Sequence, residues 1–129
     1  MAFAQEMLAT KAALGKMGHK ALVSDFVMEF LGKTETEKER LNRRNVAEKD
    51  AIKEFWEKIK KCDAILVLNY DRKGIKGYIG GNALMEIGFA HVLDKKIYLL
   101  HPIPDIPFYK AEIEGIKPVI LRGKLLNLR

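Results

Sequence analysis

The sequence predicts an α/β fold, a three-layer sandwich around a parallel sheet, and three observations support this class. Two apolar runs, residues 63–69 and 96–100, have the composition of strands that are covered on both faces. Segments with helical periodicity alternate with the predicted strands, as in right-handed βαβ units. The chain has 129 residues, 48% hydrophobic and 31% charged, which is enough for one soluble domain with a single core.

The chain is expected to open with a helix. Its apolar residues recur at helical spacing, at Phe3, Met7, Leu14 and Met17. Gly18 then ends the helix, because glycine takes the left-handed position after a helix at no steric cost. We next expect a short strand over residues 19–23 and a helical turn over residues 26–31.

One long surface helix is expected over residues 36–61. Its apolar residues fall on one face, and they are Leu41, Ile52, Phe55 and Ile59. Acidic and basic residues alternate on the other faces, which indicates solvated ion pairs rather than a basic patch. The net charge of +6 therefore does not lead us to expect nucleic acid as a partner.

Strands and helices alternate in the second half of the chain. The run 63–69 is the best candidate for the central strand of the sheet. After it we expect a loop over 70–78, a helix from 80–82 to about Leu93, a strand over 96–100, a helix over 108–114 and a strand over 118–121. A doubly wound sheet of the flavodoxin or Rossmann type normally begins with a strand, so the chain lacks the usual first strand or borrows its equivalent.

Composition predicts a cytoplasmic protein without a metal or cofactor. No apolar stretch reaches the roughly 20 residues that span a bilayer, and the first residues do not resemble a signal peptide. Cys62 is the single cysteine, so it has no partner for an internal disulfide or a thiolate zinc site. His19, His91 and His101 stand on different elements without the spacing of metal ligands.

Polar residues after the predicted strands mark the candidate site, because ligands of open α/β sheets bind outside the carboxyl ends of the strands. These residues are Asn69, Asp71, Gly80, Gly81, Asn82 and the segment 101–105, with Ser24 and Asp25 as possible neighbours at the same edge. The two glycines let backbone amides approach a ribose or phosphate, or form an ordinary turn into a helix. Asp71 is either a second acid or a turn residue.

Glu86 is the most informative candidate. It is the only formally charged residue in the predicted helix over 80–93. Its neighbours on the same side of the helix are the amide Asn82 and the small or apolar residues Ala83, Ala90 and Leu93. Burial of an unpaired carboxylate costs several kcal/mol, so we expect a partnered or catalytic group. An exposed glutamate favoured by the helix dipole, or a capping partner, is the structural alternative.

Three segments together resemble a known enzyme family. They are Asp-Ala-Ile-Leu-Val-Leu-Asn at 63–69, Gly-Gly-Asn-Ala-Leu-Met-Glu-Ile-Gly-Phe-Ala at 80–90, and Lys-Lys-Ile-Tyr-Leu-Leu followed by Pro-Ile-Pro-Asp at 95–105. This pattern resembles the nucleoside 2-deoxyribosyltransferases, whose catalytic Glu lies in a Met-Glu-hydrophobic-Gly-aromatic-Ala helix, here residues 85–90. The segment 3–18 and the strand after it also resemble that family's first helix and second strand.

The resemblance implies N-glycosyl transfer or hydrolysis on nucleosides or their monophosphates. Glu86 would attack C1′ of the sugar and form a covalent glycosyl-enzyme, which a second base or water would resolve with retention. Asn69 or Asp71 would contact the base or sugar, and the turn at 80–82 would hold sugar hydroxyls or a 5′-phosphate. The chain departs from the family at Gly80, where members carry an Asp six residues before the nucleophile.

Two other readings remain open. The missing Asp and missing first strand suit a non-catalytic module that binds a nucleotide or nucleoside sugar. An unpaired sheet edge also suits a chain that associates through that edge. Because enzymes of the resembled family are oligomers, we expect a homodimer or higher homo-oligomer.

Overall fold

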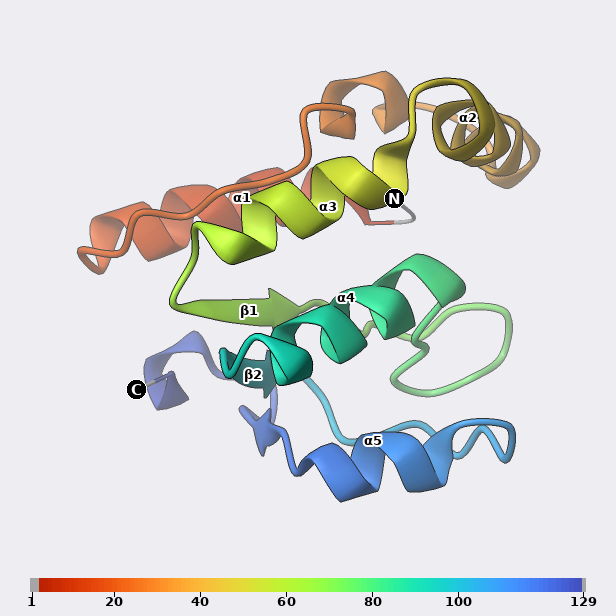
Figure 1. Cartoon of the computed structure of the whole chain (residues 1–129). Helices are drawn as coiled ribbons and strands as arrows, with labels where there is room; N and C mark the ends of the chain where they lie inside the picture. Colours follow the sequence, from red (N-terminus) through yellow and green to blue (C-terminus); the bar gives the residue numbers. More distant parts are fainter. Residues whose placement is uncertain (1–2, 129) are drawn as a thin grey trace. The chain divides into compact units, whose positions relative to one another are not determined.

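The computed structural model describes residues 3–128, and the chain divides into two compact units, one up to residue 58 and one from residue 59 onward. From its length the chain was expected to form one domain. Each unit is described by itself below, and Figure 1 identifies the elements.

The N-terminal unit begins with helix α1, Ala4–Lys16. The predicted end of this helix is confirmed, because Met17 is its C-cap and Gly18 adopts φ +93°. The expected helical turn is also present as a short 3-10 helix, η1, Val27–Phe30. Ala4, Val27 and Phe30 form a small buried cluster that joins α1 to η1.

The predicted long helix over 36–61 is wrong, because the structure has two helices there. They are α2, Glu35–Glu48, and α3, Ala51–Lys60. Asp50 separates them with φ +49°, a left-handed conformation that cannot continue a right-handed helix. Thr34 begins α2 with a capping box, in which its hydroxyl accepts from the Glu37 N–H and the Glu37 carboxylate accepts from the Thr34 N–H.

The predicted strand over residues 19–23 is also wrong, because these residues have no regular secondary structure. A strand is stable only when its main chain pairs with a neighbour. Residues 3–58 contain no strand to serve as that neighbour. One apolar residue of this segment, Val23, instead packs against the buried cluster around Phe30.

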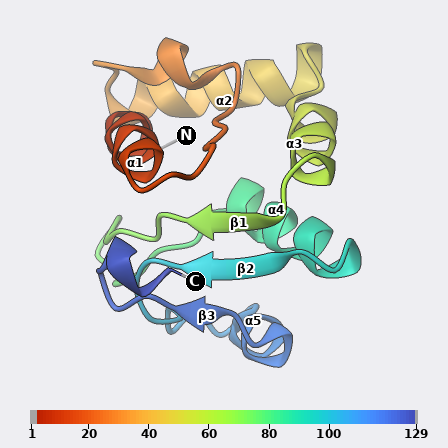
Figure 2. The same cartoon turned by 90° about the vertical axis from the view of Figure 1, so that its left-hand side faces the viewer.

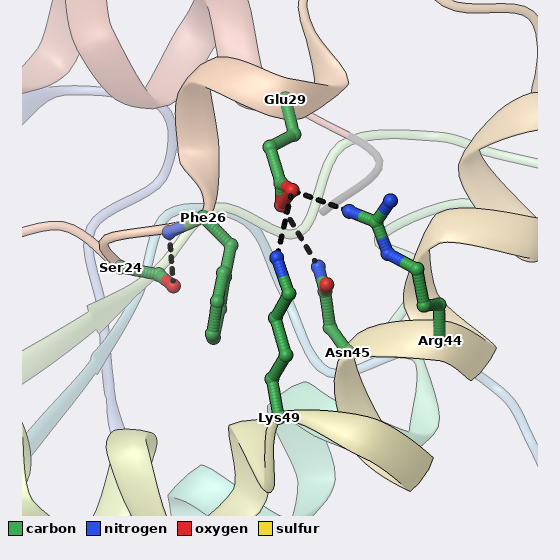
Figure 3. A network of polar contacts seen from close by, with 6 residues as sticks. All are labelled: Ser24, Phe26, Glu29, Arg44, Asn45 and Lys49. Atoms are coloured by element: carbon green, nitrogen blue, oxygen red, sulfur yellow. Dashed lines mark hydrogen bonds and ion pairs between the residues drawn. The ribbon is translucent and has the colours of Figure 1, made fainter.

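A polar network holds η1 to α2 (Figure 3). The Glu29 carboxylate accepts from the Arg44 guanidinium and from Asn45 Nδ2, the latter at 3.3 Å. The Lys49 ammonium lies 3.7 Å from Glu29 Oε1 and 5.8 Å from the centre of the Phe26 ring. Three donors therefore converge on one carboxylate.

The sheet lies in the C-terminal unit and has three parallel strands in the order β1-β2-β3. These strands are β1, Ala64–Val67, β2, Lys96–Leu99, and β3, Val119–Ile120. In the pairing register, Ile65 is opposite Ile97 and Val67 is opposite Leu99. The prediction that residues 63–69 form the central strand is therefore wrong, because β2 is central and β1 is an edge strand of the described sheet. Each crossover moves the chain one strand further in the same direction, which leaves the first strand at the side.

Helices α4, Gly81–Val92, and α5, Lys110–Ile116, provide the crossovers. Both lie behind the strands in Figure 2, on one face of the sheet. The core between these two helices and the sheet is apolar. The residues Ile87, Ala90, Leu99 and Ile113 in this core have no exposed surface. A short 3-10 helix, η2, Leu125–Asn127, follows the sheet.

The mixed α/β fold with an open parallel sheet, consistent with a flavodoxin or Rossmann-like class, is confirmed. Within residues 3–128 every helix is too short or too polar to cross a bilayer.

Candidate functional site

Asn69 ties together the ends of the two neighbouring strands β1 and β2. Its side chain is fully buried, and its Nδ2 donates to the main-chain oxygens of His101, at 2.8 Å, and Pro102, at 3.2 Å. The His101 N–H donates back to Asn69 Oδ1 at 2.8 Å. The side chain predicted to contact a ligand therefore shapes the edge of the sheet, since both of its polar atoms are used inside the protein.

The loop between β1 and α4 begins with a small hairpin. Arg72 and Ile75 exchange two main-chain hydrogen bonds, of 3.1 and 2.9 Å. The two residues between them, Lys73 and Gly74, both have positive φ, at 54° and 75°. This is the pattern of a type I′ turn, which matches the twist of paired strands. The loop is therefore an ordered projection at the rim of the sheet.

Asp71 closes the base of this loop. The residue is exposed, and its Oδ1 accepts from the Gly77 N–H at 3.0 Å. Gly77 has φ +65°, and a Cβ at this position would lie 2.7 Å from the Pro102 oxygen. Only glycine fits there. The turn role considered for Asp71 is thus present in the structure.

Aromatic side chains surround the strand ends, and the sequence alone did not identify them as site residues. The Tyr70 and His101 rings meet edge to face, with centroids 5.5 Å apart. The Arg72 guanidinium lies 5.6 Å from the centre of the Tyr78 ring. The concentration of tyrosines near the predicted strand ends was a usable signal, but their pairings depend on the loop conformation.

Tyr109 anchors the segment between the loop and α4. Its hydroxyl donates to the main-chain oxygen of Ile79. Burial raises the pKa of the Tyr109 phenol, and the nearby Tyr78 hydroxyl raises it further. The Ile79 carbonyl, two residues before the start of α4, is therefore held by a phenol that stays protonated at neutral pH.

Gly80, Gly81 and Asn82 form the beginning of α4, as predicted. Gly80 is the N-cap, with extended backbone, and its oxygen accepts from the Leu84 N–H at 2.9 Å. No side chain caps this helix end, and its first turn holds no acidic residue. Asn82 is half-buried and is engaged in an interaction. The start of α4 thus combines small residues with the positive end of the helix dipole.

Glu86 lies in the second turn of α4. It is half-buried and takes part in an interaction within the structure. The next residue, Ile87, and Ala90, four residues on, are fully buried in the core. Glu86 therefore borders the face of α4 that packs on the sheet, in the half of the helix nearest its N-terminus. It does not stand out in solvent.

The last two features are Ser24 and Asp25, as possible neighbours of the site, and metal-binding groups among the described residues. Ser24 and Asp25 are bonded within the N-terminal unit, where Ser24 Oγ donates to Glu54 Oε2 at 3.2 Å and Asp25 pairs with Lys58 at 3.2 Å. Both side chains therefore have partners within the N-terminal unit. In the part of the chain that the structure describes, no group of three His, Cys, Asp or Glu side chains could hold a metal ion.

Comparison with known proteins adds no assignment. No family model, curated protein or solved structure matched this chain. The candidate site therefore has to be interpreted from its own residues.

Proposed function

We propose that the protein cleaves the N-glycosidic bond of a nucleoside or nucleoside monophosphate, with Glu86 as the nucleophile. The observation that carries this proposal is Glu86 itself, a half-buried carboxylate that is the only formally charged group of α4 and borders the face of the helix that packs on the sheet. The resemblance of residues 85–90 to the nucleophile helix of nucleoside 2-deoxyribosyltransferases supports the same role. A cytoplasmic location belongs to this proposal, because nucleosides and their monophosphates are cytoplasmic metabolites.

The proposed reaction has two steps. A carboxylate oxygen of Glu86 forms a bond to C1′ of the sugar while the bond from C1′ to the base nitrogen breaks, and the base leaves with that electron pair and takes up a proton. Water or a second base then attacks C1′, loses a proton and releases the carboxylate. Because C1′ is inverted twice, the sugar keeps its original configuration.

The neighbouring residues have separate roles in this proposal. The exposed Asp71 is the candidate second acid of this proposal, and its carboxyl group must be protonated when it gives a proton to the departing base. The backbone amides of Gly81 and Asn82 hold the sugar hydroxyls or a 5′-phosphate at the start of α4. Asn69 positions the segment at His101 and does not bind the substrate directly, because its amide is buried.

A binding module without catalysis is the second candidate function. Gly80 stands where the resembled enzymes carry an Asp, and no acid occupies the first turn of α4. Loss of one acid–base group lowers a rate by about 10²–10⁴-fold without removing binding. This reading therefore predicts nucleoside or nucleotide binding without release of the base.

The test is a turnover assay with matched variants. The protein is incubated with each deoxynucleoside and deoxynucleoside monophosphate, with and without a free base, and products are separated by chromatography. Glu86→Gln should lower the rate by about 10³-fold or more. Glu112→Gln, the same change at an exposed position on α5, should leave it unchanged. Equal turnover by the Glu86→Gln variant would remove the nucleophile role, and calorimetry would show whether binding alone remains.

A further inference from the structure

His101 is a half-buried histidine that follows the central strand of the sheet. It stands two residues after the end of β2, at the edge where ligands of open α/β sheets bind. The other two histidines of the chain, His19 and His91, are exposed. Partial burial at this edge therefore singles out His101 among the histidines of the chain.

The ring nitrogens of His101 make no hydrogen bond to any other group in residues 3–128. The hydrogen bonds of His101 in this part of the chain use main-chain atoms, which bond the Asn69 side chain. Among the described residues, the buried side-chain polar atom that has no partner is Asn45 Oδ1, so both nitrogens of His101 reach the surface. An imidazole nitrogen that reaches the surface can give a proton to a bound molecule or take one from it.

Two neighbouring segments border the His101 ring. The Tyr70 ring meets it edge to face, with centroids 5.5 Å apart. A Cβ at Gly123 would lie 3.5 Å from His101 Cε1 and 3.9 Å from Nδ1, whereas Nε2 lies more than 4 Å from the same position. Gly123 is held beside the end of β2, because its N–H donates to the Leu100 oxygen at 2.7 Å. Nε2 is therefore the ring nitrogen that lies farther from Gly123.

A series of contacts connects His101 to the start of α4. Tyr70, which meets the His101 ring, also accepts a hydrogen bond at its main-chain oxygen from the Tyr78 N–H, at 3.1 Å. The Tyr78 ring in turn lies against Gly80, where a Cβ would meet Tyr78 Cε1 at 3.4 Å. Gly80 is the N-cap of α4, the helix that carries Glu86. His101 is therefore linked through two tyrosines to the helix of the proposed nucleophile.

Departure of a nucleobase needs a proton donor. When the bond from C1′ to the base breaks, the electron pair stays on the base, and a proton placed on another ring nitrogen of the base stabilises that charge. Carboxyl groups ordinarily carry no proton at neutral pH, whereas imidazole groups gain and lose one there. The first turn of α4 holds no acidic residue, and Asp71 already closes its loop by a bond from Gly77. A histidine at the same edge of the sheet suits the step better.

We propose that His101, through Nε2, gives the proton to a departing purine, a role that rests on the proposed function. In the first step, Glu86 bonds C1′, the bond from C1′ to the base breaks, and the imidazolium proton passes to N7 or N3 of the purine. The imidazole is then neutral. In the second step it takes the proton that the attacking water loses, while C1′ leaves the Glu86 carboxylate. Both side chains thus return to their starting states after one turnover.

Release of base from 2′-deoxyguanosine and from its N7-methyl form tests this role, with spontaneous release subtracted. The methylated base carries a positive charge, so it leaves as a neutral molecule without a proton from the protein. His101→Phe keeps a ring beside Tyr70 and the main-chain bonds to Asn69, but it has no proton to give. This variant should lose about 10²-fold or more on deoxyguanosine and stay within about threefold of wild type on the methylated substrate. His19→Gln, at an exposed position in the N-terminal unit, should behave as the wild type.

The pH dependence gives a second readout. Release from deoxyguanosine by the wild-type protein should fall as pH rises through the range where imidazole groups lose their proton. This fall should be absent for the methylated substrate and in His101→Phe. The other titratable or charged residues on the segments around the ring are Tyr70 and Asp71 on the loop, Arg122 and Lys124 beside Gly123, and Asp105. Asp71→Asn should keep the wild-type ratio between the two substrates.

The outcomes separate this role from the proposed function. Equal losses on the two substrates in His101→Phe, or no loss on either, would overturn His101 as the proton donor, while turnover that still depends on Glu86 would leave the nucleophile in place. A selective loss on deoxyguanosine in Asp71→Asn instead would assign the proton to Asp71. Release of base from neither substrate by the wild-type protein would contradict the proposed function and this role together.

Discussion

The Asn69 side chain and the His101 main chain bond each other in both directions, through two hydrogen bonds of 2.8 Å each. This reciprocal pair joins the segment after β1 to the segment after β2 at the carboxyl edge of the sheet. Because parallel strands hydrogen-bond only along their length, the chain beyond their ends needs such a contact to stay in register. One buried amide therefore contributes to holding the two segments that flank the candidate site, together with the edge-to-face contact of Tyr70 and His101.

Replacement of Asn69 should destabilise the C-terminal unit. Asn69→Ala leaves the His101 N–H and a main-chain oxygen without their partners, and a buried unpaired group costs about 1–3 kcal/mol. We expect a loss of about 2–4 kcal/mol in the free energy of unfolding by urea. Asn69→Asp should be similarly harmful, because a carboxylate cannot donate to the His101 oxygen. A loss below about 0.5 kcal/mol in both variants would show that the amide does not hold this edge.

Gly77→Ala should be more harmful than the same change at Gly74. Both glycines have positive φ, which costs an alanine about 1–2 kcal/mol. Only at Gly77 would the new methyl group also meet a backbone atom, the Pro102 oxygen, at 2.7 Å, whereas the space at Gly74 is open. Thermal denaturation of the two variants should thus show the lower midpoint for Gly77→Ala. Equal midpoints would mean that the loop moves away from Pro102 without cost.

Asn45→Asp should destabilise the N-terminal unit in a pH-dependent manner. Asn45 is buried, and its Nδ2 donates to Glu29, while its Oδ1 has no hydrogen-bond partner in the structure. An aspartate at position 45 would place a second carboxylate against Glu29. The negative charge of Glu29 then raises the folded-state pKa of the new aspartate. Such a penalty is absent below the ordinary Asp pKa of about 4 and grows as pH rises above it. Addition of Glu29→Gln should relieve it, as urea titrations at two pH values would show. A penalty that is the same at both values would contradict this explanation.

The capping box of α2 should give Glu37 a measurable pH signature. The Thr34 N–H and hydroxyl hold the pKa of the Glu37 carboxyl below its usual value. A lowered folded-state pKa stabilises the helix above the unfolded-state pKa, and this stabilisation is lost as pH falls through the folded-state pKa. An NMR titration should find the Glu37 pKa lowered in the wild-type protein and lowered by less in Thr34→Ala, which removes the hydroxyl and keeps the main-chain N–H. An identical titration curve in both proteins would contradict the capping role.

The strands β1 and β2 and helix α4 could be predicted because their signals are local. Continuous apolar runs and a glycine-led turn are visible within a few residues of sequence. The error at residues 36–61 had a subtler cause, since Asp50 interrupts the helix without a proline or glycine nearby. Its carboxylate lies 3.4 Å from the Lys53 N–H, as at the start of a new helix, and an Asp before an apolar residue was the available signal.

Strand order and segment 19–23 depended on contacts that the sequence does not record. A short apolar segment becomes a strand only when another strand lies beside it, and the described part of the N-terminal unit offers none. The rule for ligand sites in open α/β sheets selects residues that follow the strands, and Asn69 and the start of α4 do follow β1 in the structure. It could not show that the Asn69 amide is used internally, because its partners at His101 and Pro102 lie more than 30 residues away.

A covalent adduct on Glu86 is the most direct test of the proposed function. The protein is mixed with nucleosides whose sugar carries fluorine at C2′, which slows release of the glycosyl group, and the intact mass and proteolytic peptides are measured. We predict that the protein gains the mass of one sugar residue, that the base appears free in solution, and that the label maps to Glu86. Label on another residue, or base release without any adduct in the wild-type protein and equally in Glu86→Gln, would contradict the assignment of Glu86 as the nucleophile.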